Sequence, residues 1–230
     1  MQIIKNEKTI QRNARVGFIL SIAAFLILGA GMYISFAQPD YFYLSIIALL
    51  VGFFLSQIGI FFTNRWGRTV RPDQILDKAL KGLDKQYSIY HYLTPSSHLL
   101  IGPAGIWVLL PKHQRGTITY QKSRWRQKGG GILLSYLKIF GQEGIGRPDL
   151  EIESEVDKME IFLKKNLPDL EIPPINVALV FFHPDVNLQV DDAPTPTLPD
   201  KKLKDLIRKE AKTKPISMSD IQAIQDFLGE

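Results

Sequence analysis

Hydrophobic and polar residues are distributed unevenly along this chain. Asp40 is the only charged residue between positions 16 and 62, whereas charges recur every few residues elsewhere. The block contains two apolar runs, Val16–Phe36 with 21 residues and Tyr43–Phe62 with 20 residues. Because a helix rises about 1.5 Å per residue, each run is long enough to cross a hydrocarbon core of about 30 Å. A cleaved signal peptide has a shorter apolar region and no second run close behind it. The pattern therefore predicts a transmembrane helical hairpin over residues 16–63.

The segments that flank the two runs predict how the hairpin is oriented. The connector Ala37–Phe42 is too short to hold a domain, and it contains no basic residue. Basic residues instead flank the outer ends of both runs: Lys5, Lys8, Arg12, Arg15, Arg65, Arg68 and Arg71. The positive-inside rule then places both termini in the cytoplasm. We expect a multi-pass protein of a prokaryotic cell membrane, with a cytoplasmic segment 1–15 and a basic juxtamembrane linker 64–71.

The rest of the chain alternates between helix-like and strand-like patterns. Apolar spacing and end signals predict helices at 73–83, 150–167, 201–212 and 219–228, and strands at 87–93, 98–101, 106–110, 117–121 and 177–182. This order predicts an α/β domain over residues 72–212 and a C-terminal helix within 213–230. Glycine-rich stretches bound an insertion, 129–147, whose apolar centre ILLSYLKIF fits either an amphipathic segment on the bilayer or an insertion packed on its own domain.

Composition narrows the possible chemistry. The chain has 230 residues, 45% of them hydrophobic, so it is not a disordered protein, and it has no cysteine. Disulfides, thiolate metal sites and cysteine nucleophiles are therefore excluded. The sequence contains no phosphate-binding P-loop, no serine-hydrolase elbow and no dinucleotide fingerprint, and its four histidines lack the spacing of a zinc site. We expect no bound metal.

Charges in the second half of the chain are grouped by sign. Positions 112–128 hold six basic residues and no acid, whereas positions 149–171 hold eight acids and three lysines. A basic strand pair facing an acidic helix and a patch that binds phosphates both fit this pattern. The candidate nucleic-acid-binding residues are Lys112, Arg115, Lys122, Arg124, Trp125, Arg126 and Lys128.

Ser97–Lys112 (SHLLIGPAGIWVLLPK) has a recognisable pattern of two apolar strands joined by GPAG. It resembles the core of the nuclease-related domain, NERD, a family that itself resembles the PD-(D/E)XK nucleases. The likeness covers about residues 72–210, because a TITYQ strand, a helix led by Pro148 and an apolar strand ending at Phe181–Phe182 follow in the expected order. The resemblance implies a cytoplasmic, restriction-endonuclease-like mixed sheet flanked by helices.

The resemblance also implies a metal site that this chain lacks. In that chemistry an Asp and a Glu on adjacent strands hold Mg²⁺, and a nearby lysine helps to place the attacking water. Aligned by GPAG, Ser97 occupies the Asp position, Leu110 occupies the Glu position, and Lys112 alone remains. A hydroxyl is a weak ligand for Mg²⁺, and leucine supplies no ligand. Acids elsewhere that could replace the lost pair are Asp73, Asp77 and Glu151.

Three functions follow from these observations. The first is a membrane-anchored, catalytically inactive NERD-like domain that acts as a binding or scaffold module, with nucleic acid as a candidate partner. The second is a structural subunit of a membrane protein assembly, with a membrane protein as its partner. The third is a membrane-tethered nuclease, the one case in which Mg²⁺ would be a cofactor. The lipid bilayer is a partner in all three, and the oligomeric state is open.

Overall fold

The computed structural model describes residues 1–67, 70–129, 144–213 and 216–229. The chain forms two compact units. One, called the hairpin below, contains the described residues of Glu7–Arg71; the other, called the sheet domain, contains Met1–Asn6 and the described residues from Pro72 onward. The apolar centre of the insertion predicted at 129–147 and the basic residue Arg68 lie outside the described residues.

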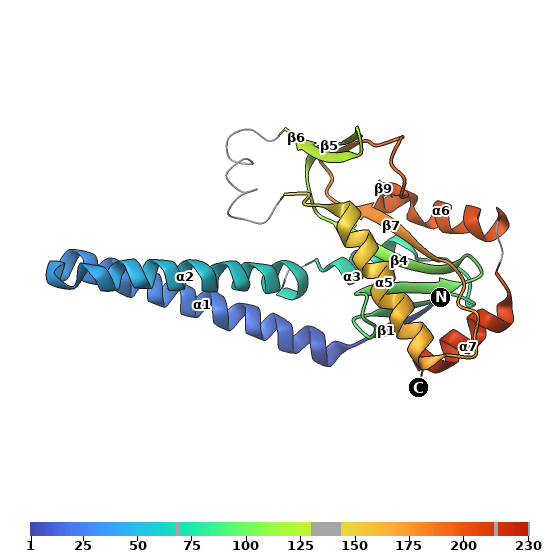
Figure 1. Ribbon diagram of the computed structural model, residues 1–230, viewed down its shortest axis with the longest axis horizontal. Helices are drawn as coiled ribbons and strands as arrows, with labels where there is room; N and C mark the ends of the chain where they lie inside the picture. The colour runs from blue at the N-terminus through green and yellow to red at the C-terminus, as the bar shows by residue number, and fades with distance from the viewer. Residues whose placement is uncertain (68–69, 130–143, 214–215, 230) are drawn as a thin grey trace. The chain divides into compact units, whose positions relative to one another are not determined.

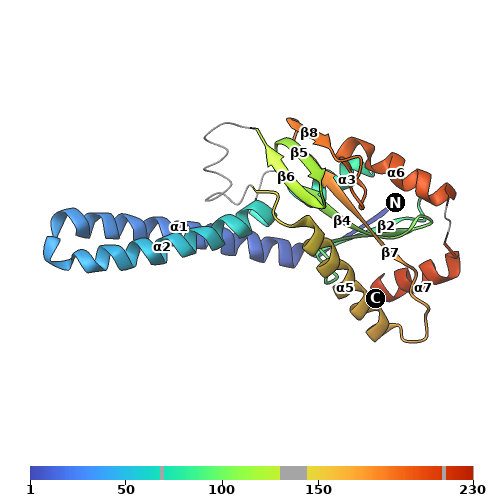
Figure 2. The same cartoon turned by 45° about the horizontal axis from the view of Figure 1, so that its top comes forward.

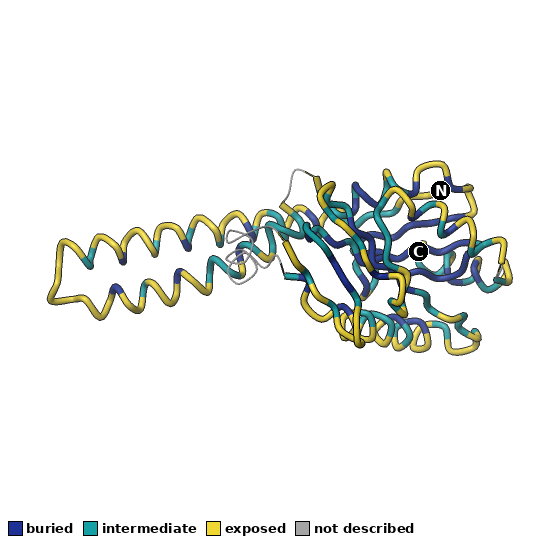
Figure 3. Tube along the Cα trace, turned by 90° about the horizontal axis from the view of Figure 1, so that it is seen from above, coloured by how far each residue is buried: buried dark blue, intermediate teal, exposed yellow. Residues whose placement is uncertain are grey.

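The hairpin consists of two long apolar helices. Helix α1 spans Glu7–Ala37, a short 3₁₀ turn spans Pro39–Tyr41, and helix α2 spans Phe42–Phe62, followed by a π-helical turn at Thr63–Gly67. Pro39 starts the connecting turn, where its fixed φ and missing N–H are tolerated. Both helices are long and apolar enough to cross a membrane, by length and composition. Most of the residues in both helices are exposed (Figure 3).

The two helices meet along a seam of mostly small residues. The buried positions recur every seven residues: Ile10, Gly17, Ala24 and Gly31 on α1, and Ser45, Gly52 and Gly59 on α2. A seven-residue repeat keeps one side of a helix against its partner, and small residues let two backbones approach closely. A Cβ atom added to Gly52 would lie 2.6 Å from Cγ of Leu28, so this position has no room for a side chain.

The sheet domain is built on a six-stranded mixed sheet with the order β1-β2-β3-β4-β7-β9. Strands β2, β3 and β4 form an antiparallel meander, whereas β1 is parallel to β2, and β7 is parallel to both β4 and β9. The strand bounds are Gln2–Lys5 (β1), Ser88–His91 (β2), His98–Gly102 (β3), Gly105–Lys112 (β4), Ile175–Phe181 (β7) and Thr197–Pro199 (β9).

Helices cover both faces of this sheet (Figures 1 and 2). Helices α5 (Pro148–Asn166) and α7 (Met218–Gly229) pack on one face, and α3 (Pro72–Ala79) and α6 (Asp200–Thr213) pack on the other. Successive residues of a strand point to opposite faces. Val108 and Leu110 accordingly join the core under α5, while Trp107 and Leu109 join the core under α3. The continuous apolar run of β4 reflects burial on both sides.

A second sheet, with the order β6-β5-β8, completes the domain. It contains β5 (Gly116–Gln121), β6 (Arg124–Lys128) and β8 (Val186–Gln189). A two-residue turn joins β5 to β6, and both of its residues, Lys122 and Ser123, have positive φ angles of 51° and 56°. This geometry matches the right-handed twist of a hairpin, but glycine and asparagine normally supply it.

The structure confirms the α/β class and the helices and strands predicted from the pattern. Several strands had no assignment from the pattern: β1 lies in the segment 1–15, and β8 and β9 lie in stretches without a predicted element. Strand β6 lies in the basic stretch 112–128, for which a strand pair was one of two open interpretations. The C-terminal helix belongs to the sheet domain, because Ile221 and Ile224 of α7 are fully buried in its core. The predicted boundary at 212/213 therefore does not separate two units.

Candidate functional site

Of the three positions at which the resemblance expects catalytic residues, two lie on β4 and one lies just before β3. Leu99 of β3 pairs with Val108 of β4, and Ser97 lies just before β3, the strand that pairs with β4. Lys112 follows on the same face of β4 as Leu110, two residues further along. Leu110 is only 7% exposed and belongs to the core under α5. These positions have a hydroxyl and an isobutyl group where a metal needs carboxylates.

Lys112 forms an ion pair with Glu151 in the first turn of α5. Pro148 opens this helix, where its missing N–H costs nothing, and thereby fixes the position of Glu151 one turn further along. The Lys112 side chain is 10% exposed, against 42% for Glu151. The ammonium group is therefore covered and neutralised, so the structure does not place Lys112 among the exposed residues that could contact phosphates.

Asp73 and Asp77 lie on the opposite face of the sheet and belong to a different group of side chains. This buried polar cluster consists of Lys5, Asp73, Asp77, His91 and His98. Lys5 on β1 lies beside His91 on β2, which lies beside His98 on β3, because the strand registers align all three. Helix α3 supplies the two carboxylates one turn apart.

Short contacts link every member of the buried polar cluster. Nζ of Lys5 lies 2.9 Å from Oδ2 of Asp73 and 2.5 Å from Oδ2 of Asp77. Nε2 of His91 lies 3.0 Å from Oδ1 of Asp77, and the Nδ1 atoms of His91 and His98 are 2.8 Å apart. Because a carboxylate only accepts hydrogen bonds, His91 donates from Nε2. When His91 is neutral, its Nδ1 accepts and His98 donates.

The charges in the cluster stabilise one another. Burial alone would raise the pKa of Asp77, but hydrogen bonds from His91 and Lys5, with their charges, bring this pKa below its ordinary value. Burial alone would lower the pKa of Lys5, but hydrogen bonds to Asp77 and Asp73, with their charges, hold this pKa above its ordinary value. Asp77 and Lys5 therefore both remain charged across the neutral range.

The cluster does not rebuild a metal site. In the described part of the chain, no group of three or more His, Cys, Asp and Glu side chains is placed to hold a metal ion. Lys5 already neutralises Asp73, which is fully buried, and the sheet separates both aspartates from Lys112. These two acids therefore cannot replace the carboxylates missing at Ser97 and Leu110.

The second sheet presents a cationic outer face. Arg124, Arg126 and Lys128 alternate along β6 and are exposed. Their register partners on β5 are Gln121, Thr119 and Thr117, which are polar. Lys122 is also exposed, in the turn between the two strands, whereas Arg115 is half-buried just before β5. Among the six basic residues of positions 112–128, Lys112 is the one that pairs with an acid of α5 within the described residues.

Trp125 belongs to the inner face of the same sheet. Its ring lies against Tyr120, its register partner, with centroids 5.0 Å apart. Both rings pack against the core under α5. Trp125 therefore holds the second sheet on the domain and does not offer an outward stacking surface for bases.

None of the protein families, curated proteins or solved structures compared with this chain matches it. The resemblance to NERD domains therefore rests on the residues quoted for it.

Proposed function

We propose that this protein is a membrane-anchored, catalytically inactive NERD-like domain that binds nucleic-acid phosphates without sequence preference. The observation that carries the proposal is the outer face of β6, where Arg124, Arg126 and Lys128 are all exposed on one side of a single strand. Lys122 extends this cationic face at the turn.

The spacing of these cations suits a polyanion. Alternate residues of a strand lie about 6.4–6.8 Å apart, so the three side chains form a row rather than a single pocket. A row of exposed cations neutralises successive phosphates and releases condensed counterions, which gives affinity without reading bases. Two of the polar partners on β5, Thr117 and Gln121, are accessible and offer further hydrogen bonds to phosphate oxygens, whereas Thr119 is buried.

Catalytic inactivity is supported by what occupies the nuclease positions. Ser97 and Leu110 supply no anionic ligand, and Lys112 is engaged with Glu151. Without two carboxylates, nothing offsets the cost of dehydrating Mg²⁺ at this place. A restriction-endonuclease-like fold remains part of the proposal, supported by the β3–β4 hairpin with its GPAG turn and by the helix and parallel strand that follow.

Membrane anchoring is supported by the hairpin. Both helices are apolar on their outward sides and meet through a seam of small residues, as helices that pack within lipid do. Basic residues flank both outer ends and are absent from the connector, which supports cytoplasmic termini in a prokaryotic cell. The cationic face would then meet nucleic acid in the cytoplasm.

The test uses the full-length protein in nanodiscs of phosphatidylcholine, a zwitterionic lipid that does not compete for the cationic face. Binding of a fluorescent duplex is measured for the natural protein and for the variant Arg124→Ala/Arg126→Ala/Lys128→Ala. The matched control, Lys201→Ala/Lys202→Ala/Lys209→Ala, removes the same charge from exposed positions of α6. We expect the first variant to lose most of its affinity and the control to retain it. An equal loss of affinity in both variants would show that binding depends on net charge alone and would refute the proposed binding face.

A second candidate function is a structural subunit of a membrane assembly. The exposed apolar sides of both helices favour it, because such surfaces can contact other membrane helices. Gentle solubilisation followed by co-purification distinguishes the two functions. A stoichiometric membrane partner together with no nucleic-acid binding would favour the second.

A further inference from the structure

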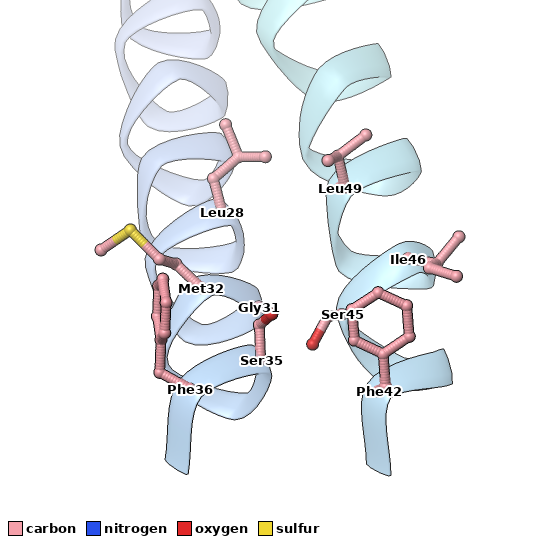
Figure 4. Close-up of a pocket in the computed structure, with 9 residues that line it drawn as sticks. All are labelled: Leu28, Gly31, Met32, Ser35, Phe36, Phe42, Ser45, Ile46 and Leu49. Carbon is pink, nitrogen blue, oxygen red and sulfur yellow. The ribbon is translucent and has the colours of Figure 1, made fainter. Parts of the chain in front are cut away.

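A cavity of about 270 Å³ lies between α1 and α2, near the connector (Figure 4). Its walls are mostly apolar, with two serines, and the lining residues are Leu28, Gly31, Met32, Ser35, Phe36, Phe42, Ser45, Ile46 and Leu49. The heptad seam places Gly31 and Ser45 here, so the helices lack large side chains at their point of contact. The cavity therefore lies wholly within the hairpin.

The hydroxyl of Ser45 has no partner in this cavity. Ser45 is only 9% exposed, and its Oγ makes no hydrogen bond within the described residues. Figure 4 shows that the hydroxyl points toward α1, into the gap between the helices. A buried hydroxyl without a partner is unfavourable, so this position favours an occupant that accepts a hydrogen bond.

The apolar walls of the cavity disfavour water as its occupant. One water takes about 30 Å³ in the liquid, roughly a tenth of the space here. Apolar side chains of both helices line the remainder. The complementary ligand therefore has an apolar body and one hydrogen-bond acceptor.

The depth of Ser45 indicates which ligand this is. Ser45 lies three residues after Phe42, where α2 begins, and therefore about 4.5 Å into the helix. Tyr41 and Tyr43, which are 50% and 57% exposed, have the amphipathic rings typical of the membrane interface. In a phospholipid, the ester carbonyls lie just where the headgroup region meets the hydrocarbon. Ser45 is thus at the depth at which an ester carbonyl and the first methylenes of its chain meet the protein.

We propose that this cavity binds one acyl chain of a glycerolipid, whose ester carbonyl accepts a hydrogen bond from Ser45. The chain then runs deeper along Leu28 and Leu49, at the upper end of the cavity in Figure 4. This inference rests on the proposed insertion of the hairpin in a membrane, but it is independent of the orientation of the hairpin and of nucleic-acid binding.

The test compares ester with ether lipids. The full-length protein is reconstituted in vesicles of phosphatidylcholine with a trace of a photoactivatable phosphatidylcholine whose diazirine is on an acyl chain. Resistance to alkaline extraction is measured first, to establish insertion. Cross-linked peptides that contain Leu28, Met32 or Leu49 are then quantified with diester or diether phosphatidylcholine as the competitor. We expect the diester to displace the label roughly 2- to 12-fold better, the factor that one hydrogen bond contributes.

Three variants test whether the Ser45 hydroxyl causes the preference for the diester lipid. Ser45→Ala keeps the cavity and removes the hydroxyl, so the diester should lose its advantage. Ser35→Leu fills the cavity and should abolish the labelling. Ser56→Ala is the matched control, because its hydroxyl bonds Phe53 O within its own helix at 2.8 Å, and it should change nothing.

Four results would overturn the proposal. Labelling spread evenly along both helices would indicate nonspecific contact with bulk lipid. An ester preference unchanged in Ser45→Ala would exclude the hydrogen bond. A second copy of the chain cross-linked through the cavity would identify a protein occupant. Failure to insert would refute membrane anchoring and this inference together, whereas insertion without site-specific labelling refutes this inference alone.

Discussion

Lys112 of β4 and Glu151 of α5 form an ion pair. The resemblance to NERD domains expects a catalytic lysine at position 112 and a metal-binding carboxylate at position 110, where this chain has Leu110. The pair ties the start of α5 to the end of the longest strand. Removing one partner would leave the other charge without its counterion next to the core. The residue that most suggests nuclease chemistry therefore has a structural partner in this protein.

The natural protein should not cleave DNA or RNA with Mg²⁺ or Mn²⁺. Ser97 and Leu110 supply no carboxylate, and Asp73 and Asp77 are on the other face of the sheet. A plasmid-nicking assay checks this expectation. Nicking by the natural protein that Asp73→Asn or Glu151→Gln abolishes would contradict it.

Restoring the two acids should create a divalent site. In the variant Ser97→Asp/Leu110→Glu, the new glutamate replaces a side chain that is 7% exposed, so burial raises its pKa and destabilises the fold. Added Mg²⁺ should recover part of this loss, because a ligand that binds only the folded state stabilises it. Thermal melts with and without Mg²⁺ measure the recovery, and the natural protein, which should show no such shift, is the control.

Lys5→Met should destabilise the sheet domain by about 3–5 kcal/mol at neutral pH, because it removes an ammonium group that is bonded to the fully buried Asp73 and to Asp77. Lys8→Met, at an exposed position, should have little effect. Thermal or denaturant unfolding of both variants in detergent gives the comparison. A loss no greater than that of Lys8→Met would mean that the cluster does not depend on this ammonium.

The same cluster predicts a pH profile. The depressed pKa of Asp77 contributes stability that is present above its unfolded-state value, about 3.9, and is lost as pH falls through the lower folded-state pKa. The raised pKa of Lys5 contributes stability that is present below about 10.4 and is lost as pH rises through the folded-state pKa. Stability measured against pH should therefore fall at both ends, and Asp77→Asn should remove part of the acid-side fall. A variant with an unchanged acid limb would contradict the assignment.

Ser123→Gly should stabilise the protein by about 0.5–1 kcal/mol, because an L residue at positive φ is strained and glycine is not. The measurement is the shift in thermal midpoint. Nucleic-acid binding should be unchanged, because Lys122 and the cations of β6 are kept. Gln121→Gly, within β5, is the control and should destabilise instead.

Much of the fold could be predicted because its elements have strong periodicity. The apolar runs of β4 and β7 and the spacing of α5 follow from burial that is local to each element. The position of β6 stayed open, as one half of a possible basic strand pair, since Lys122–Ser123 has none of the residues that usually mark a two-residue turn. Strand β1 has only four residues, and its pairing with β2 joins positions more than 80 apart.

Part of the candidate site could also be predicted, because its residues are close together in the sequence. Leu110 and Lys112 lie on one strand of a hairpin and Ser97 lies just before the other strand, so the hairpin itself follows from the GPAG turn. The buried polar cluster depends on three strands and a helix, and Lys5 enters it only through the unpredicted strand β1. The one available signal was a pair of histidines, His91 and His98, in two consecutive predicted strands. The inward position of Trp125 depends on the register of β6, so it could not be predicted from the sequence either.

Membrane topology can be tested by labelling introduced cysteines, because the chain contains no cysteine of its own that would react. Asp40→Cys, in the connector, should react with a membrane-impermeant thiol reagent in intact cells. Lys201→Cys, exposed on α6, should react only after lysis. The reverse pattern would place the sheet domain outside the cytoplasm.

The salt dependence of duplex binding tests the central claim most directly. Each phosphate that a cation neutralises contributes a slope of about −0.9 to a plot of log affinity against log salt concentration. The three cations of β6 should therefore give the full-length protein a slope of about −2 to −3, nearly abolished in Arg124→Ala/Arg126→Ala/Lys128→Ala. No binding at low salt, or the same slope in that variant, would contradict a phosphate-binding role for this face.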